Sequence, residues 1–412
     1  MTRLLAPELF GLMSIASIVM VGLTLLTDIG IRQNIIQHRH DNDQEFFDAA
    51  WTLQIFRGFA IWLTSCLLSV ILSALNEANV FSEDSIYSDD RLPIIISIIS
   101  LSAVIEGFSP IKFSLSIRKL DQTRITFIEI SAQLLGVLAM LIWIYFDRSI
   151  WAMVMGWLYG VAAKIILSYI LIPGRNNRIV WNLRAFKTII KFGKWIFLTS
   201  LIGFMLTSGD RLILGIKTSP ETMGFYSIAF LMVNTIYMMT SKLSSSIIFP
   251  ALSDVFRRRP EDLSKTLYNF KIWIDSGMLF TSGFLFSTGG LIVDLLYDDR
   301  YAQAGRILQI LALTLVANRY AIADQCYLSM GKPHVMTYLI AMRTMVFYIL
   351  VPFGLYTYGL NGALWCIVLS GIVTIPASLL AQHKYGILNI SRELVVLPIF
   401  LVGVTLGHFM VR

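Results

Sequence analysis

The sequence predicts an all-α membrane protein whose helices cross the bilayer about twelve times. Of its 412 residues, 56% are hydrophobic and only 14% are charged, against roughly a quarter charged in an ordinary soluble domain. The mean hydropathy of the chain is +0.70. Its apolar residues also gather into runs near the length of about 20 residues that a helix needs to cross a membrane. These observations exclude a soluble globular domain.

The predicted spans follow one another from end to end of the chain. Each is bounded by polar or charged residues, which would lie at the two bilayer surfaces. The three cysteines fall inside the spans without paired spacing, so neither a disulfide framework nor a zinc site is predicted. The spans are residues 9–28, 51–75, 93–111, 126–146, 150–172, 195–216, 224–250, 274–297, 306–329, 335–357, 361–382 and 394–411.

The basic residues are distributed unevenly among the loops between these spans. Most of the 33 lysines and arginines that the chain contains fall in alternate loops. Because cytoplasmic loops are enriched in Lys and Arg, this alternate set is predicted to be cytoplasmic, and the acidic loop at 76–90 to face outward. The net charge of +7 therefore indicates membrane topology, and no nucleic-acid partner is expected.

A repeated frame divides the chain into two halves. The pattern P-E-x-x-G-x-x-S occurs at residues 7–14 and again at 220–227. The second copy follows an apolar span and the first does not, so we expect a further helix to belong before the first copy. The predicted domains are a first helical lobe that lacks this helix at 1–172, a basic linker at 173–194, and a second lobe with one extra C-terminal helix at 195–412.

Two shorter patterns predict local structure. Apolar and basic side chains alternate along residues 178–194 in a way that is typical of an amphipathic helix in the anionic inner interface, with a plain basic loop as the alternative. Gly156 and Gly160 stand four residues apart, a spacing that favours close contact between membrane helices.

Several stretches along the chain carry a resemblance to a known family. They read LLAPELFGLMSIASIV at 4–19, LLTDIGIRQNIIQ at 25–37, GDRLILG at 209–215, MGFYSIAF at 223–230, FPALSDVF at 249–256 and LYDDRYAQAGRILQILAL at 296–313. In this order they resemble the oligosaccharide and polysaccharide flippases of the multidrug/oligosaccharidyl-lipid/polysaccharide transporter superfamily.

This resemblance implies two pseudo-symmetric six-helix lobes around a central cavity that opens alternately to the two sides of the membrane. It implies a transporter, not an enzyme, that moves an undecaprenyl-pyrophosphate-linked sugar unit across a bacterial inner membrane for surface polysaccharide (lipopolysaccharide) synthesis. We expect a monomer without cofactor or metal, with a proton or sodium ion as a possible coupling ion. The alternatives are a multidrug or cation exporter of the same superfamily and a membrane-embedded polysaccharide polymerase or ligase.

Charged side chains inside the predicted spans are the candidate binding residues. A cation at the centre of a spanning helix costs about 2.5 to 3.5 kcal/mol, so it should face a wet passage or an anion. Several share helix faces with polar side chains, as expected of a track for a pyrophosphate and sugar hydroxyls. Snorkelling to the headgroups, helix packing and pairing with intramembrane acids are the alternatives. The candidates are Arg57, Lys164, Asn234, Lys242, Asn318, Arg319, Gln325 and Arg343.

Three further charged residues receive separate predictions. Asp324 lies in the same span as Arg319 and is the candidate ion-coupling carboxylate, with an internal ion pair as the alternative. Asp210 and Arg211 belong to the GDR stretch and are predicted to form a structural hinge pair near the outer end of the span at 195–216, with ligand contact as the alternative.

Overall fold

The computed structural model describes residues 5–27, 31, 35, 44–118, 121–183, 186, 201, 203–205 and 207–411. Within these residues every regular element is a helix. The chain forms two compact units, of which the first ends at Pro220 and the second begins at Glu221. The predicted all-α membrane fold is therefore confirmed.

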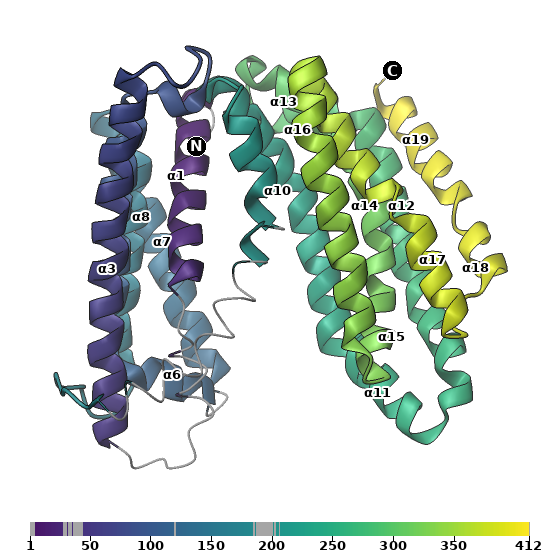
Figure 1. The fold of residues 1–412 in the computed structure, drawn as a ribbon, viewed down its shortest axis with the longest axis horizontal. Helices are drawn as coiled ribbons and strands as arrows, with labels where there is room; N and C mark the ends of the chain where they lie inside the picture. Colours follow the sequence, from purple (N-terminus) through teal and green to yellow (C-terminus); the bar gives the residue numbers. More distant parts are fainter. Residues whose placement is uncertain are drawn as a thin grey trace. The chain divides into compact units, whose positions relative to one another are not determined.

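The first unit is a bundle of helices. Figure 1 shows α1, α3, α7 and α8 running alongside one another, with α6 across one end of them. The segment Arg91–Gly107 is bent by 74° from Ile111–Ile117, so this predicted span is broken. The elements are α1 (Pro7–Leu26), α3 (Gln44–Glu77), η1 (Ile86–Ser88), α4 (Arg91–Ile99), α5 (Leu101–Gly107), α6 (Ile111–Arg118), α7 (Gln122–Phe146) and α8 (Ile150–Leu171).

The second unit is a larger set of helices interrupted by short turns. Its elements are α10 (Pro220–Leu243), the π-helical η2 (Ser244–Ile248), α11 (Phe249–Arg258), η3 (Pro260–Asp262), α12 (Leu263–Leu296), η4 (Asp299–Tyr301), α13 (Ala302–Ala312), α14 (Thr314–Asn318), η5 (Arg319–Ala323), α15 (Asp324–Ser329), α16 (Pro333–Ile372), α17 (Ile375–Lys384), α18 (Ile390–Val395) and α19 (Pro398–Val411).

Both copies of the repeated frame begin a helix. Pro7 is the first residue of α1 and Pro220 the first of α10, with Glu8 and Glu221 in the first turn of each. Proline suits the first position because a backbone N–H there would have no partner within the helix, so its absence costs nothing. A carboxylate in the first turn is stabilised by the positive end of the helix dipole. The repeat thus specifies how one helix starts in each half of the sequence.

Glycines allow the closest helix contacts, because without a side chain two backbones can touch. A Cβ atom added to Gly136 of α7 would lie 2.8 Å from the carbonyl oxygen of Gly156 and 3.0 Å from the Cα of Gly160 on α8. This confirms the predicted helix contact at Gly156 and Gly160. Between α12 and α19, a Cβ at Gly283 would lie 2.2 Å from the carbonyl oxygen of Phe400.

The described residues contain nine helices long and apolar enough to cross a membrane, or ten if the bent pair counts as one. One of these, residues 333–384, contains a reversal at Gly359, where φ is 63° and ψ is −151°. Gly354 and Gly362 touch across it, although residues eight apart in a continuous helix are about 12 Å apart. This segment therefore supplies two of the predicted spans (Figure 1).

Gly359 should tolerate no side chain, because its backbone angles belong to a region that only glycine adopts readily. We expect Gly359→Ala to lower the free energy of unfolding by about 1–3 kcal/mol, measured by urea unfolding in mild detergent. Gly290→Ala is the control, because that glycine is helical and a Cβ there meets nothing within 4 Å in the described residues. Equal stability of the two variants would contradict the reversal.

The loop at 78–90, which is predicted to face outward, packs on the end of the helix at 207–215. The backbone N–H of Ile86 donates to the carbonyl of Thr218 at 2.8 Å, and the Tyr87 hydroxyl donates to the carbonyl of Leu212 at 3.0 Å.

Burial alone would raise the pKa of Asp89, but hydrogen bonds from Arg91 outweigh the effect of burial and lower that pKa. The carboxylate consequently stays ionised and anchors the start of α4.

Some predictions fall largely on residues that the structure does not describe. The linker at 173–194 contains 184–185 and 187–194, and the span at 195–216 contains 195–200, 202 and 206, all outside the described residues. Residues 178–182 are described and are not helical, so the amphipathic helix does not begin at residue 178. The domain boundaries and the count of twelve spans remain predictions.

Candidate functional site

A cavity of about 360 Å³ lies within the first unit, between helices that are distant in the sequence. Its walls come from the end of α1, the middle of α3, α5, the start of α6 and α8. Two of the predicted binding residues, Arg57 and Lys164, line it together. The full lining is Thr24, Ile31, Gln54, Arg57, Gly58, Ile61, Ala103, Glu106, Gly107, Ser109, Phe113, Ser114, Lys164 and Ile165.

Arg57 reaches the cavity from α3 and caps the last turn of α1. Its Nη2 donates to the carbonyl of Thr24 at 2.7 Å, and its Nε lies 3.4 Å from the hydroxyl of Thr27. The last carbonyls of a helix have no partner within the helix and carry the negative end of its dipole, so a guanidinium is stabilised there. These contacts fix the position of the Arg57 side chain at the cavity wall.

Lys164 reaches the same cavity from α8. Its Nζ lies 5.3 Å from the centre of the Phe113 ring, within range of a cation–π contact. It has no carboxylate within 4 Å among the described residues, and its side chain is half-buried. A lysine in this position keeps its ammonium group able to bind an anion that enters the cavity.

The cavity wall is held by close backbone contacts. A Cβ atom at Gly58 would lie 2.4 Å from the carbonyl oxygen of Ala103, so α3 and α5 are in direct contact. The Gln54 amide nitrogen donates to the carbonyls of Glu106, Gly107 and Ser109 at 3.0–3.1 Å. These three bonds satisfy carbonyls at the break between α5 and α6, where the helix cannot satisfy them. The wall is therefore preorganised.

The chemistry of the cavity favours an anion. Among the described residues, its lining combines two cationic side chains with the hydroxyls of Thr24, Ser109 and Ser114, against one carboxylate, Glu106, which is exposed. Charge-assisted hydrogen bonds from guanidinium and ammonium groups to phosphate are stronger than neutral ones. A phosphate-bearing ligand fits this arrangement better than a cation does.

Arg319 lies elsewhere, in a buried ion network of the second unit. Its guanidinium contacts Asp275 at 2.8 Å and Glu393 at 3.2 Å, and it is only 2% exposed. Lys271, 0% exposed, also binds both carboxylates, with Glu393 at 2.7 Å. This is the pairing with intramembrane acids that the sequence left open as an alternative. Arg319 is therefore not proposed as a ligand-binding residue.

Sequence reasoning missed two members of this network. Lys271 lies outside the predicted span at 274–297, but α12 begins at Leu263 and includes it. Glu393 lies just outside the last predicted span, in α18. The available signal was the spacing of Lys271 and Asp275, which are four residues apart and so share a helix face.

A second group of predicted residues meets in the second unit. The Arg343 Nη2 donates to the amide oxygen of Asn318 at 2.7 Å. Asp324 is near enough to Arg343 for a Coulombic interaction, yet the described residues contain no cation within 4 Å of its carboxylate. Arg343 is thus half-buried and bonded to Asn318, with no carboxylate within 4 Å among the described residues.

The remaining predicted residues are not gathered into one site. Lys242 is exposed, and Asn234 and Gln325 are half-buried; none of the three lines the cavity of the first unit. Asp210 and Arg211 are adjacent, with 3.7 Å between the Asp210 Oδ1 and the Arg211 Nε, and Arg211 also donates to the carbonyl of Thr207. Their contacts agree with a structural pair.

Residues 1–304 match the family described as polysaccharide biosynthesis protein. The chain belongs to this family. It is 22% identical over 383 residues to the putative O-antigen transporter of Shigella flexneri, covering 88% of this chain and 87% of that protein. It is 23% identical over 275 residues to the lipopolysaccharide biosynthesis protein WzxC of Escherichia coli (strain K12), covering 66% of this chain and 52% of that protein. The match thus spans about half the length of the second relative.

Solved transporter structures share the fold of this polysaccharide biosynthesis family member. A multidrug resistance MATE family transporter of the MOP superfamily, in an inward-facing conformation, has a TM-score of 0.71 at 12% identity, covering 92% of this chain and 91% of that one. The lipid II flippase MurJ, in an inward closed conformation, has a TM-score of 0.69 at 13% identity, covering 97% and 84%. At these identities the likeness concerns the fold alone.

Proposed function

We propose that the protein is a flippase that moves a lipid-pyrophosphate-linked oligosaccharide across the bacterial inner membrane for surface polysaccharide synthesis. The family match over residues 1–304 carries this proposal. The putative O-antigen transporter of Shigella flexneri, which aligns along most of both chains, supports it. Movement would follow alternating access, in which the helical units open to one side and then the other.

The cavity of the first unit is the proposed contact for the cargo's pyrophosphate. The planar guanidinium group of Arg57 on α3 suits two phosphate oxygens, and the ammonium group of Lys164 on α8 suits a further one. A cation exporter would need a cavity dominated by carboxylates, whereas the described part of this lining holds two cations and one exposed carboxylate. The undecaprenyl chain of the cargo would stay in the bilayer.

Asp324 remains the proposed ion-coupling carboxylate, and Arg343, which the sequence predicts as a binding residue, is its proposed partner. Asp324 has no close ion pair among the described residues, and Arg343 is its nearest electrostatic partner. A proton or sodium ion that bound the carboxylate would weaken its attraction for Arg343, which belongs to a different helix. Ion binding could in this way change how α15 and α16 pack.

Lys164→Gln tests the proposed contact with the pyrophosphate. We expect the variant to bind and transport an undecaprenyl-pyrophosphate-linked oligosaccharide about 10- to 100-fold less well, because a hydrogen bond to a charged group contributes about 1.5–3 kcal/mol. Transport is measured in vesicles, as the arrival of a fluorescent cargo in the leaflet where a quencher reaches it.

Arg124→Gln is the matched control, since Arg124 is exposed, pairs with Asp121 and lies outside the cavity lining. It removes the same charge from the same unit and should transport normally. Wild-type transport by Lys164→Gln would overturn the assigned contact, and absence of transport by the wild-type chain would overturn the function.

A further inference from the structure

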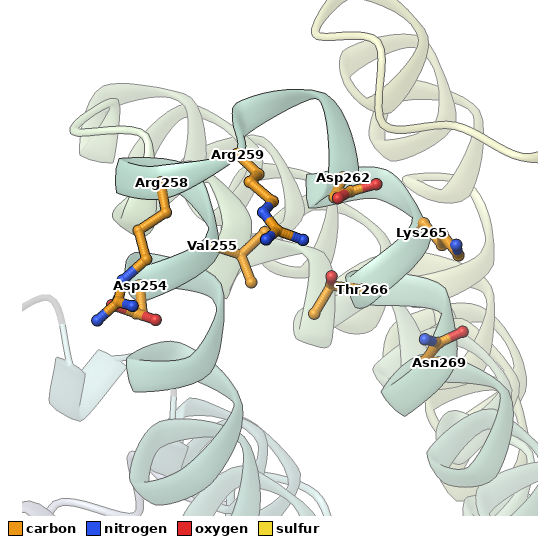
Figure 2. Close-up of a pocket in the computed structure, with 8 residues that line it drawn as sticks. All are labelled: Asp254, Val255, Arg258, Arg259, Asp262, Lys265, Thr266 and Asn269. Carbon is orange, nitrogen blue, oxygen red and sulfur yellow. The ribbon is translucent and has the colours of Figure 1, made fainter.

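A second cavity, of about 380 Å³, lies in the second unit at the turn between α11 and α12. Figure 2 shows its lining, with Arg259 reaching over the space between the two helices. The cavity is far in sequence from Arg57 and Lys164 and plays no part in the proposed transport. It is lined by Asp254, Val255, Arg258, Arg259, Asp262, Lys265, Thr266 and Asn269.

The charges in this lining are not balanced. Arg258 pairs with Asp254 at 3.0 Å, but among the described residues no carboxylate lies within 4 Å of the Arg259 or Lys265 side chain. Arg392 of α18 adds a further cation beside the cavity, since its Nη1 donates to the amide oxygen of Asn269 at 3.3 Å. The lining holds Arg258, Arg259 and Lys265 against Asp254 and Asp262, and its remaining positive charge and polar groups suit a phosphate.

One exposed stripe connects the cavity to the membrane. Lys265, Asn269 and Trp273 are each four residues apart on α12, so they share one face, and all three are exposed, Trp273 by 80%. Along about 12 Å this face changes from an ammonium group through an amide to an indole. Exposed tryptophan in a membrane helix marks the headgroup level. The cavity thus opens where lipid phosphates lie.

The neighbouring helix supports the same placement. On α11, Leu252 is buried in the unit, whereas Phe256 is 37% exposed beside the exposed Arg257. An exposed aromatic ring next to basic residues is typical of a segment in the interface. This loop also belongs to the set that is rich in Lys and Arg and is predicted to be cytoplasmic, where anionic lipids attract basic segments.

We propose that this cavity binds the phosphate headgroup of an anionic phospholipid from the inner leaflet. Arg259 and Lys265 would contact the phosphate, Thr266 and Asn269 would donate hydrogen bonds, and an acyl chain would follow Trp273. This occupant fits because it matches both the positive lining and the apolar end of the stripe. The proposal does not rest on the flippase assignment.

The test measures binding of fluorescent phosphatidylglycerol to the purified full-length chain in neutral detergent micelles. We expect binding to be weakened about 25-fold in the double variant Arg259→Gln/Lys265→Gln, since each basic residue near an anionic headgroup contributes about fivefold. The double variant Arg124→Gln/Arg175→Gln removes the same charge from exposed positions of the first unit, outside the lining, and should bind like wild type.

Competitors separate this lipid from other sources of phosphate. Unlabelled phosphatidylglycerol should displace the probe, whereas phosphatidylcholine, inorganic pyrophosphate and an undecaprenyl-pyrophosphate-linked oligosaccharide should displace it at least tenfold less well. Equal displacement by any of these three would overturn the proposal, as would equal binding by the two double variants. Circular dichroism and gel filtration confirm that each variant is folded.

Discussion

Replacing Glu393 with glutamine is expected to lower the free energy of unfolding by about 3–5 kcal/mol. In the folded protein this carboxylate faces both Lys271 and Arg319, which are almost completely buried. Without it, two cations would share the single charge of Asp275 in a site closed to water. An uncompensated buried charge costs far more than the pair contributes when it is intact.

A second substitution should restore most of this loss. In Glu393→Gln/Lys271→Met the network keeps one cation and one anion, because Arg319 still contacts Asp275 at 2.8 Å. Glutamine also keeps an oxygen that accepts the hydroxyl of Tyr268, which donates to Glu393 at 2.8 Å. We expect the double variant to be more stable than Glu393→Gln alone, since replacing an ion pair with apolar groups is often neutral or stabilising.

The measurement is urea unfolding in mild detergent, followed by tryptophan fluorescence. Asp254→Asn serves as control because its pair with Arg258 is exposed, and such pairs contribute about 0–1 kcal/mol. If Glu393→Gln unfolds at the same urea concentration as wild type, the buried network does not exist in the folded protein as described.

Gly283→Val is expected to destabilise the second unit by about 3 kcal/mol. A Cβ atom at Gly283 would lie 2.2 Å from the carbonyl oxygen of Phe400, and one at Gly403 would lie 2.4 Å from that of Phe280. Both atoms that a Cβ would meet belong to the backbone, so no side-chain rotation can make room for it. The substitution would therefore force α19 away from α12. Packing against α12 is the main contact of α19 with the rest of the second unit.

Gly277→Val, on the same helix, provides the comparison. That glycine is exposed, and a Cβ there meets nothing within 4 Å in the described residues, so the substitution should change stability by less than about 1 kcal/mol. The same unfolding assay measures both variants. Similar stability of Gly283→Val and Gly277→Val would show that α12 and α19 do not pack through their glycines.

Part of the fold could be read from local patterns. Helices that cross a membrane must hydrogen-bond their own backbone, so long apolar runs predict them directly. The repeated frame coincides with the starts of α1 and α10, although the predicted spans begin at residues 9 and 224, and Gly156 and Gly160 predicted a close helix contact whose partner proved to be α7. The predicted helix boundaries were less accurate. α12 starts at Leu263, before its apolar run, because a helix continues beyond the bilayer surface as long as its backbone N–H and C=O groups stay hydrogen-bonded.

Part of the candidate site could be predicted in the same way. The cost of a cation inside a span identified Arg57, Lys164, Arg319 and Arg343 as residues that need an explanation. That cost is the same whether the cation faces a cavity or a carboxylate. The sequence could not choose between these environments, because the partners of each cation lie on other helices.

By itself, the sequence determined that this is a helical membrane protein and which cations needed a partner or a polar cavity. Only the tertiary structure decided that Arg57 and Lys164 line one cavity while Arg319 is neutralised by Asp275 and Glu393. The physical reason is that hydrophobicity and helix starts depend on neighbours along the chain. The surroundings of a buried charge depend instead on how helices distant in sequence rotate and pack.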